Sequence, residues 1–323
     1  MNTFGHNFRI SIWGESHAEQ VGICIDGTPA GISLSEETFE ADLMRRRSGT
    51  AGTTTRHETD RPQIVSGVYE GHTTGAPITI VFANTDIRSA DYNQFATHPR
   101  PSHADRVAAC KFGGLNDPRG GGHFSGRLTV ALTAAGVVAK QLLHSLHFNT
   151  QIVELGGCAD TTQYDQILVA AAAAGDSVGG VVECRVNGIQ SGVGEPFFDS
   201  AESVISHLLF AIPAVKGVEF GNGFEAAKLR GSQNNDLLVA ANGATATNHA
   251  GGINGGVCNG NELIVRVAVK PTSSIAKEQM TYNFETKNIE PLHIHGRHDT
   301  CIALRAAVVV EAAIAIALAD LSI

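Results

Sequence analysis

The run from Ala306 to Leu318 is the most membrane-like stretch of this sequence, and it limits what the chain can fold into. Glu311 lies in the middle of the run, and Arg305 and Asp320 flank it. A membrane-spanning helix needs about 20 consecutive apolar residues, whereas a shorter apolar run with a central charge is typical of a helix in a protein core. We therefore expect a buried helix here, and we expect no membrane as a partner.

The opening sequence and the cysteines indicate an intracellular protein. MNTFGHNFRISIWG lacks an apolar run after a basic start, so we expect no signal peptide. The six cysteines are scattered, and no two form a CxxC pair. This pattern indicates reduced, mostly buried thiols and argues against a disulfide framework or a zinc site. We expect a cytoplasmic protein that holds no metal.

The pattern of apolar residues predicts mixed α+β structure in one compact unit, residues 1–323. Ser33 and Glu36 form a capping-box pattern that opens a helix with Phe39 and Leu43 on one face. We predict strands at 8–13, 21–25, 64–68, 77–82, 181–186 and 263–269, and further helices at 104–111, 126–146 and 201–210.

The charges are distributed unevenly along the chain. The net charge is −9, yet arginine outnumbers lysine 16 to 7, and eleven arginines precede residue 128. An acidic chain with one arginine-rich half is a poor match for nucleic acid, so we expect no such partner. It suits a small anionic substrate, because guanidinium groups bind carboxylate and phosphate in bidentate fashion.

The segment Gly14-Glu15-Ser16-His17-Ala18 resembles a hydrolase nucleophile elbow, GxSxG, with its last glycine replaced. That elbow requires a helix after the turn, whereas residues 21–25 look like a strand, which disfavours Ser16 as a nucleophile. His17 on a tight turn could instead act as a general acid toward a leaving group. A histidine that merely completes the turn is the plainer interpretation, and the sequence leaves it open.

Three further segments could form a site. Arg100-Pro-Ser-His103-Ala-Asp105 presents an arginine and a histidine on a rigid turn, and Gly296-Arg297-His298-Asp299 could pair a base with a cation or cap the next helix. The run Arg119-Gly-Gly-Gly-His123-Phe-Ser-Gly-Arg127 could expose backbone N–H groups at a helix N-terminus to an anion, or form a plain glycine turn. The residues alone thus indicate histidines and arginines around a phosphate-bearing ligand, without identifying a reaction.

Read in order, these segments resemble the chorismate synthase family, nearly from end to end. The matching pieces are FGHNFRISIWGESH, Asp26-Gly-Thr-Pro-Ala-Gly31, Arg45-Arg-Arg-Ser-Gly49, RPSHAD, RGGGHFSGR, IPAVKGVEFGNGF, NHAGGINGG, KPTSS and GRHD. Each piece is unspecific alone, but nine pieces in family order are not explained by coincidence. The resemblance implies a β-α-β sandwich with helices packed between antiparallel sheets, and a homotetramer.

The resemblance also implies an activity. It is that of a carbon–oxygen lyase which eliminates phosphate from 5-enolpyruvylshikimate 3-phosphate, in an anti-1,4-elimination that depends on reduced FMN and gives chorismate for aromatic amino acid biosynthesis. Reduced flavin would supply electron density transiently with no net redox change, and an external flavin reductase would provide it. The resemblance further associates NADP with the family.

Site residues follow from the resemblance position by position. His17 would protonate the departing phosphate, His103 would manage the proton on the reduced flavin ring, and Asp299 would assist removal of the substrate proton through flavin N5. The substrate would be held by Ser16, Arg46, Arg100 and Arg127. Reduced FMN would be held by His123, Phe124, Ser125, Ala214, Gly255, Lys270, Pro271, Thr272, Ser273, Ser274 and Arg297.

The chain departs from the family pattern at a few places. The family prefers glycine where this chain has Ala18 and Ser102, an arginine where it has Gly52, and a proline where it has Thr300. It is also short between about Leu146 and Gly180. None of the carried-over catalytic residues is lost, so we expect an active enzyme. The alternatives are a serine hydrolase built on Ser16 and a flavin-binding protein without catalytic activity.

Overall fold

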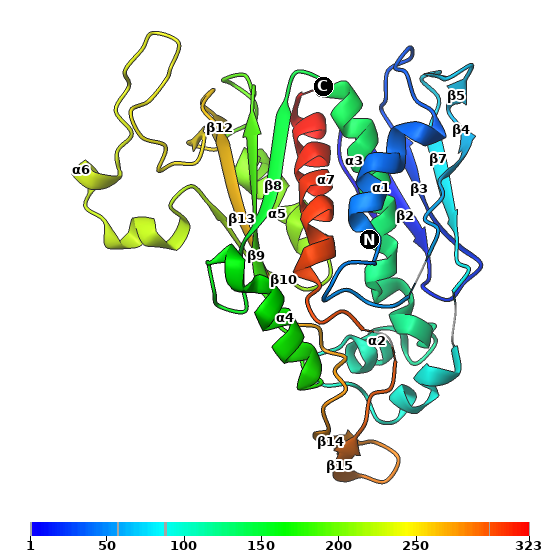
Figure 1. Ribbon diagram of the computed structural model, residues 1–323. Coiled ribbons are helices and arrows are strands. Elements are labelled where there is room, and N and C mark those ends of the chain that lie inside the picture. The colour runs from blue at the N-terminus through cyan, green and yellow to red at the C-terminus, as the bar shows by residue number, and fades with distance from the viewer. Residues whose placement is uncertain (1, 57, 87–88, 297, 323) are drawn as a thin grey trace.

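Two antiparallel sheets enclose a layer of helices in the computed structural model, which describes residues 2–56, 58–86, 89–296 and 298–322 (Figure 1). In Figure 1 the central helices α7, α3 and α1 stand between the sheets, with β8, β9 and β13 on one side and β2, β3 and β7 on the other. The expected α+β class, with helices packed between antiparallel sheets, is confirmed.

The first sheet has five strands in the order β1-β2-β3-β7-β4. In β3 and β7 most residues are buried, because these strands are central in the sheet and one face packs on the helices. The strands are β1 (Thr3–Phe4), β2 (Arg9–Gly14), β3 (Gln20–Asp26), β4 (Gln63–Ser66) and β7 (Ile78–Ala83).

The second sheet has four strands in the order β10-β13-β9-β8. In β13 the buried residues alternate strictly with less buried ones, so one face of this strand supplies Leu263, Val265, Val267 and Val269 to the core. The strands are β8 (His147–Leu155), β9 (Gly180–Asn187), β10 (Val215–Phe220) and β13 (Leu263–Val269).

Three two-stranded ribbons extend from this body. The β14–β15 ribbon projects below the sheets in Figure 1, and a small apolar cluster of Phe95, Leu292 and Ile294 lies at its base. The ribbons are β5 (Val68–Tyr69) with β6 (His72–Thr73), β11 (Ile253–Asn254) with β12 (Val257–Cys258), and β14 (Gln279–Asn283) with β15 (Asn288–Leu292).

The helices differ widely in burial. Every residue of α3 from Thr129 to Ala139 is buried, whereas α4 buries only Leu168. The helices are α1 (Glu40–Arg46), α2 (Asp105–Phe112), α3 (Thr129–Leu142), α4 (Tyr164–Ala173), α5 (Ala201–Ala211), α6 (Gly231–Asn234) and α7 (Ala303–Ser322).

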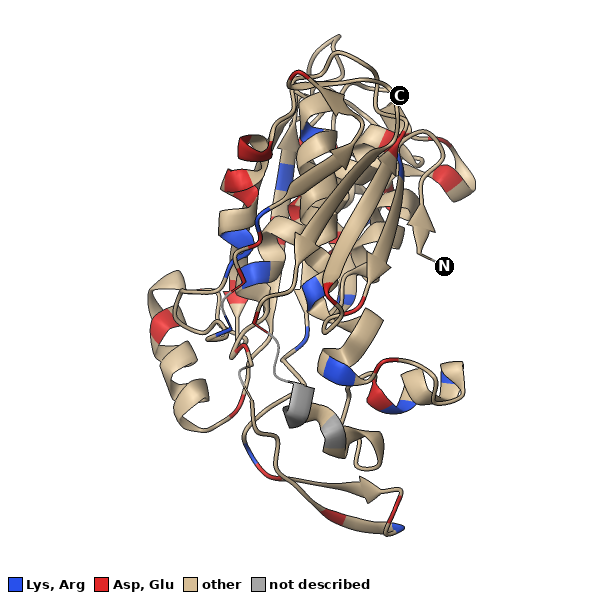
Figure 2. Cartoon of the chain, turned by 90° about the vertical axis from the view of Figure 1, so that its right-hand side faces the viewer, with Lys and Arg blue, Asp and Glu red and all other residues tan. Residues whose placement is uncertain are grey.

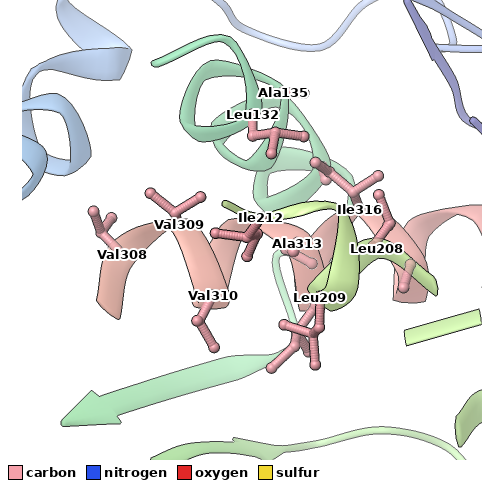
Figure 3. Packing of buried hydrophobic residues seen from close by; sticks show 14 of the residues in the cluster. Leu132, Ala135, Leu208, Leu209, Ile212, Val308, Val309, Val310, Ala313 and Ile316 are labelled. Atoms are coloured by element: carbon pink, nitrogen blue, oxygen red, sulfur yellow. The ribbon is translucent and has the colours of Figure 1, made fainter. Parts of the chain in front are cut away.

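Helix α7 is the expected buried helix, and it packs between the sheets against α3 and α5. Its residues Val309 and Ile316 lie among Leu132 of α3 and Leu208 of α5 (Figure 3). A Cβ at Gly136 of α3 would overlap Ala312, so the two helices approach closely because both residues are small. Within the described part of the chain, no helix is long and apolar enough to span a membrane.

Asp320, near the end of α7, fastens the start of the chain to this core. Its side chain is buried, and Oδ1 accepts hydrogen bonds from the backbone N–H groups of His6, Asn7 and Phe8 at 2.6–2.8 Å. A carboxylate that accepts several N–H groups satisfies donors that burial would otherwise leave unpaired. The segment that leads into β2 is therefore held against the last helix.

Some boundaries differ from the sequence predictions. Ser35, not Ser33, is the N-cap of the first helical segment, a 3-10 helix at Glu36–Phe39 that continues into α1. Ser33 instead forms a β-bridge with His72, which moves the helix start two residues onward. The helix predicted at 126–146 ends at Leu142, because a turn leads directly into β8. The other predicted strands and helices are confirmed to within a few residues.

Candidate active site

Two adjoining cavities open where the ends of α1, α3 and α7 meet the segments just before β10 and just after β13. The first, of about 270 Å³, is lined mainly by charged and hydroxyl side chains, and we call it the polar cavity. The second, of about 510 Å³, is lined largely by apolar side chains such as Ile12, Leu132 and Leu208, and we call it the apolar cavity. The two share Phe124, Ser125, Pro213, Ala214 and Lys270.

The polar cavity carries an excess of positive charge. In Figure 2, Lys, Arg, Asp and Glu segments lie close together near the lower ends of the central helices. Without the histidines, seven cations line the polar cavity against three carboxylates, within the ranges the structure describes. Because the whole chain has a net charge of −9, this excess is a local feature of the cavity. The cations are Arg46, Arg47, Arg56, Arg100, Arg127, Arg305 and Lys270, and the carboxylates are Glu58, Asp60 and Asp299.

Arg46 and Arg127, both predicted to hold the substrate, share one carboxylate. Asp60 accepts Arg46 Nη1 on Oδ2 at 2.7 Å and Arg127 Nη1 on Oδ1. All three residues are at most 6% exposed. Burial opposes the charge of Asp60, but the two guanidinium groups outweigh it and lower the pKa of this carboxyl group. Burial, reinforced by neighbouring Arg127 and Arg305, lowers the pKa of Arg46 to about 10, so it stays charged at neutral pH.

Arg100 and His103 share a second carboxylate, that of Asp105 at the start of α2. Arg100 donates Nε and Nη2 to Asp105 at 2.8 and 2.7 Å, and His103 Nδ1 lies 2.6 Å from Asp105 Oδ1. Burial raises the pKa of Asp105, but hydrogen bonds from Arg100 and His103 more than reverse this and hold it well below its usual range. The motif Arg100-Pro-Ser-His-Ala-Asp105 therefore folds so that its last residue orients the other two.

Asp299 is paired with a cation that lies outside its own motif, Gly296-Arg297-His298-Asp299. Arg305, in the first turn of α7, donates Nε and Nη2 to Asp299 at 3.0 and 2.6 Å, and the backbone N–H of Thr54 donates at 2.9 Å. The observed partner of Asp299 thus lies outside the motif, and no backbone N–H group in the first turn of α7 donates a hydrogen bond to Asp299 among the described residues. Arg297 lies outside the described residues.

His17 lies behind the wall of the polar cavity rather than on it. The side chain is 6% exposed, and its ring meets the edge of Tyr92, with centroids 5.1 Å apart. Burial, followed by the nearby cations Arg56 and Arg119, lowers the pKa of His17, so the neutral imidazole is favoured at neutral pH. Ser16 is fully buried and is followed by strand β3 rather than a helix. The elbow geometry is therefore absent, and the nucleophile interpretation of Ser16 has no structural support.

The glycine run separates the two histidines. Gly120, Gly121 and Gly122 have φ of 60°, 82° and 54°, which suits glycine. A Cβ at Gly120 would lie 2.5 Å from the His17 ring, and one at Gly121 would lie 3.3 Å from His103. A 3-10 helix at Gly126–Leu128, N-capped by Ser125, continues into α3, so a helical N-terminus follows the run as expected. The glycine backbone spaces the two rings, and the anion-site interpretation stays a prediction.

Most of the predicted cofactor residues gather at the junction of the two cavities. His123 lines the apolar cavity and its Nδ1 lies 2.8 Å from the Gly14 carbonyl oxygen. Lys270 lines both cavities and donates Nζ to the Ser102 carbonyl oxygen at 3.1 Å. Thr272 Oγ1 is buried without a hydrogen-bond partner among the described residues, which leaves a hydroxyl available to a ligand. The residues that line one or both cavities are His123, Phe124, Ser125, Ala214, Lys270, Pro271, Thr272, Ser273 and Ser274.

Gly255 is the exception among these residues. It lies in the turn between β11 and β12, and the next residue, Gly256, accepts a hydrogen bond from Ala201 at the start of α5. The apolar cavity touches the other end of the same helix, at Ala211. With a rise of 1.5 Å per residue, this helix is about 15 Å long, so Gly255 is remote from the cavity of its own chain.

Backbone strain is concentrated at the polar cavity. Left-handed φ values are uncommon outside glycine and tend to cluster at functional sites. Of the six non-glycine residues with such values in the described ranges, three line this cavity: Asp60 (φ 46°), Ser102 (φ 57°) and Ala214 (φ 78°). Ser102 is a position where the family prefers glycine, and its conformation explains that preference. Ala18 has no such φ, so its side chain is accommodated there without this strain.

Several cavity residues were missed by reasoning from the sequence. Arg47 has a buried Nε without a hydrogen-bond partner in the described structure, and Arg56 is paired with Glu58 at 2.6 Å. Tyr92 lies between His17 and Arg100, whose guanidinium carbon is 5.6 Å from its ring. The high density of arginines before residue 128 could have indicated Arg47 and Arg56. No sequence pattern indicates Glu58 or Tyr92.

Known proteins resemble this chain over nearly its whole length. A family model described as chorismate synthase matches residues 8–323. A chorismate synthase of Chitinophaga pinensis is 56% identical over 321 residues, which cover 99% of this chain and 96% of that protein. One of Archaeoglobus fulgidus is 43% identical over 350 residues, covering 99% and 96%. A crystal structure of chorismate synthase superposes with a TM-score of 0.74 at 26% identity, covering 98% of this chain and 92% of that one.

Proposed function

The chain belongs to the chorismate synthase family, and on that premise we propose that it eliminates phosphate from 5-enolpyruvylshikimate 3-phosphate to give chorismate. The reaction is an anti-1,4-elimination in the shikimate pathway, and the enzyme is a carbon–oxygen lyase that acts on a phosphate ester. We further infer that residues 1–323 act as one domain, since one apolar cluster extends from Ile10 in the first sheet to Val269 in the second.

The charge of the polar cavity is the observation that carries this proposal. The substrate has one phosphate and two carboxylates, which together bear about four negative charges at neutral pH. The lining residues supply four more cations than carboxylates, again without the histidines. A cavity of about 270 Å³ with this charge suits a small, highly anionic molecule and disfavours a neutral one.

The residues at the junction of the cavities fit reduced FMN. A flavin has a flat apolar ring system and a phosphate-bearing polar tail, and here an apolar cavity of about 510 Å³ adjoins a cationic one. Thr272 Oγ1, unpartnered in the described structure, and the Lys270 ammonium offer polar contacts beside Phe124 and Ala214. Burial, together with Lys216, lowers the pKa of Lys270, which an anionic ligand would counteract. When bound, reduced flavin supplies electron density that helps phosphate to depart, and it is regenerated in each turnover.

The chain's own residues then bind the substrate and move protons. Arg46, Arg100 and Arg127, with Ser16 nearby, hold the anionic groups of the substrate. Desolvation of the cavity strengthens these charge-assisted hydrogen bonds.

His17 protonates the departing phosphate. It is favoured as the neutral imidazole in the free protein, and so it takes up its proton when the phosphate dianion enters and raises its pKa. His103, oriented by Asp105, holds a proton next to the reduced cofactor.

Asp299 is proposed to assist removal of the substrate's ring proton. Two hydrogen bonds from Arg305 and one from the Thr54 backbone hold this buried carboxylate in place. Arg305 thus orients the carboxylate through charge-assisted hydrogen bonds. Arg305 is thereby part of the proposed machinery, although no sequence motif includes it.

The assembly and the partners belong to the same proposal. A homotetramer would bring the β11–β12 turn of one copy to the cavity of another, and only in that way could Gly255 contact the cofactor, given its distance from its own cavity. The assignment of Gly255 and the tetramer are therefore linked. The reduced flavin comes from an external flavin reductase, which is also the point at which NADP would enter, and the setting is the cytoplasm.

Phosphate release under anaerobic conditions tests the proposed function. The enzyme is mixed with 5-enolpyruvylshikimate 3-phosphate and either dithionite-reduced or oxidised FMN, and phosphate and chorismate are measured. We expect both products with reduced FMN, none with oxidised FMN, and no net flavin oxidation. Stoichiometric flavin oxidation would contradict the proposal, and FMN binding without phosphate release would indicate a non-catalytic flavin protein.

A further inference from the structure

Asp60 lies between two of the arginines proposed to bind the substrate, yet no motif includes it. Its two oxygens accept one guanidinium nitrogen each, from Arg46 at 2.7 Å and from Arg127. It is 2% exposed, and it lines the polar cavity. A carboxylate on the wall of an anion site opposes anion binding by its charge, so its presence calls for an explanation.

The two guanidinium groups are fixed almost completely by protein groups. Arg46 donates Nε to Thr129 Oγ1 and Nη2 to the carbonyl oxygens of Gly126 and Arg127, besides its bond to Asp60. Arg127 donates Nε to Asn84 Oδ1 at 2.8 Å and Nη2 to the Ala83 carbonyl oxygen at 3.1 Å. Each guanidinium has five N–H donors, so each is held in one orientation with only a small remainder directed to a ligand.

Asp60 connects the two arginines at a cost in backbone energy. Its φ of 46° is left-handed, a conformation that Asp tolerates better than most residues but that still carries strain. Arg46 and Arg127 are both buried and both cationic, and each disfavours the charge of the other. Without a shared carboxylate, two such cations would separate or draw water into the cavity.

We propose that Asp60 is a positioning residue that holds Arg46 and Arg127 side by side as a preformed pair for the phosphate or carboxylate of the substrate. The proposal rests on the function proposed above. Asp60 itself does not touch the substrate. It fixes the angle and separation of two guanidinium groups, so that they bind an anion without rearrangement when the substrate enters.

This role and a purely electrostatic role predict opposite results for Asp60→Asn. If only charge mattered, removing a carboxylate from the cavity would strengthen anion binding. If Asp60 positions the arginines, the same change weakens anion binding, because one charged hydrogen-bond acceptor is lost and the two cations separate. Asn is the appropriate replacement, since it has nearly the shape of Asp and also tolerates left-handed φ.

The chain offers a matched control in Asp42. This carboxylate is also buried and also lies between two cations, Arg45 at 3.1 Å and Lys140, but it lines neither cavity. Asp42→Asn therefore removes the same kind of interaction at a place where no substrate binds.

The experiment measures binding of inorganic phosphate by calorimetry and KM for the substrate in wild type, Asp60→Asn and Asp42→Asn, after circular dichroism has confirmed folding. We expect Asp60→Asn to weaken phosphate binding and to raise KM by about tenfold or more, with a smaller change in kcat. Asp42→Asn should leave both values near wild type. Equal or tighter binding by Asp60→Asn, or equal weakening by Asp42→Asn, would overturn the proposal.

Arg127→Lys keeps the inference testable if Asp60→Asn does not fold. Lysine retains the charge but not the planar fork, so a preformed pair predicts a similar loss of phosphate binding, and wild-type binding by this variant would sink the idea. Phosphate binding is independent of turnover. A wild-type protein that binds phosphate but releases none from the substrate would therefore contradict the proposed function and leave the role of Asp60 intact.

Discussion

Arg45 and Arg46 are neighbours in α1, but they belong to two clusters of opposite character. Arg45 joins Asp42, Lys140 of α3 and Glu311 of α7 in what we call the helix cluster, which has two cations and two carboxylates. Arg46 belongs to the polar cavity, where the cations exceed the carboxylates. The helix cluster lines neither of the two cavities.

The surroundings shift the pKa values of the two arginines in opposite directions. The hydrogen bond to Glu311 raises the pKa of Arg45, whereas burial lowers the pKa of Arg46 to about 10. Balanced charges at the helix junction stabilise each other, while an excess of cations in a cavity destabilises the free protein and is relieved by an anionic ligand. The balance of charge, more than the number of charges, distinguishes a structural cluster from a binding site here.

Among the variants of the polar cavity, His103→Ala should have the largest effect on turnover. We expect His103→Ala to reduce turnover by about 10²–10⁴-fold with little change in the unfolding midpoint, because it removes a proton carrier from a partly open position. Steady-state phosphate release and thermal unfolding measure the two quantities. His17→Ala should reduce turnover similarly, but only His103→Ala should alter the absorption spectrum of bound reduced flavin. Wild-type turnover in both variants would show that the two histidines have structural roles only.

In the helix cluster, Glu311→Gln should show the reverse pattern, a loss of stability with turnover retained. Burial raises the pKa of Glu311, but Arg45 and Lys140 reverse this and lower it to about 2. Because the folded-state pKa lies below the unfolded one, Glu311 stabilises the protein above about pH 4.5, and this stabilisation is lost as the pH falls toward 2. We expect Glu311→Gln to lower the free energy of unfolding at pH 7 by about 3 kcal/mol, with turnover retained.

Urea unfolding at pH 7 and at successively lower pH values tests this prediction. The difference between wild type and Glu311→Gln should shrink as the pH approaches the folded-state pKa. Asp26→Asn, which breaks an exposed pair with Arg9, serves as the control and should change stability by less than about 1 kcal/mol. A pH-independent difference would mean that packing, rather than charge, holds the cluster.

Arg127→Ala should have an intermediate effect on binding, and a loss of stability should accompany it because the buried carboxylate of Asp60 loses one of its two partners. It removes charge-assisted hydrogen bonds worth about 1.5–3 kcal/mol, so we expect substrate affinity to fall at least about tenfold. Equilibrium binding of the substrate is the measurement. Arg185→Ala is the matched control, since Arg185 is paired with Glu183 and Glu262 on the second sheet and lines neither cavity. Unchanged affinity in Arg127→Ala would remove this residue from the site.

The smallest effect should come from ionic strength. Raising the salt concentration from about 0.05 to 0.5 M shortens the screening length, so KM for the anionic substrate should rise a few-fold. The buried pairs of the helix cluster are screened less, and the unfolding midpoint should therefore change little. A KM that is independent of salt would contradict a cavity whose excess positive charge attracts the substrate.

The sequence predicted the main helices and strands better than it predicted the contacts within the site. Alternating apolar residues predicted β13, and the run around Glu311 predicted a buried α7, because burial on a periodic face depends on local pattern. The strands β8 and β10 and the β14–β15 ribbon were missed, since their residues are too mixed in polarity to stand out from loops.

The candidate site was predicted as separate motifs, and their pairing could not be. Arg46, Asp60 and Arg127 are separated in the chain, and no local pattern indicates that a carboxylate in the segment before β4 will meet two arginines. Likewise, the partner of Asp299 is Arg305, which lies six residues beyond the motif that ends at Asp299. The roles assigned to these residues remain predictions that the experiments above address.

The position of α7 along the chain has a consequence for how the protein is made. This helix packs between both sheets, yet it is translated after every other described helix and strand, and Asp320 binds the backbone of His6, Asn7 and Phe8. Until α7 leaves the ribosome, the inner face of the second sheet and the face of α3 that packs on α7 are uncovered, and they expose apolar surface to other nascent chains and to chaperones. A premature stop just before α7 would thus leave a polypeptide with most of its sequence but without the helix that completes its core.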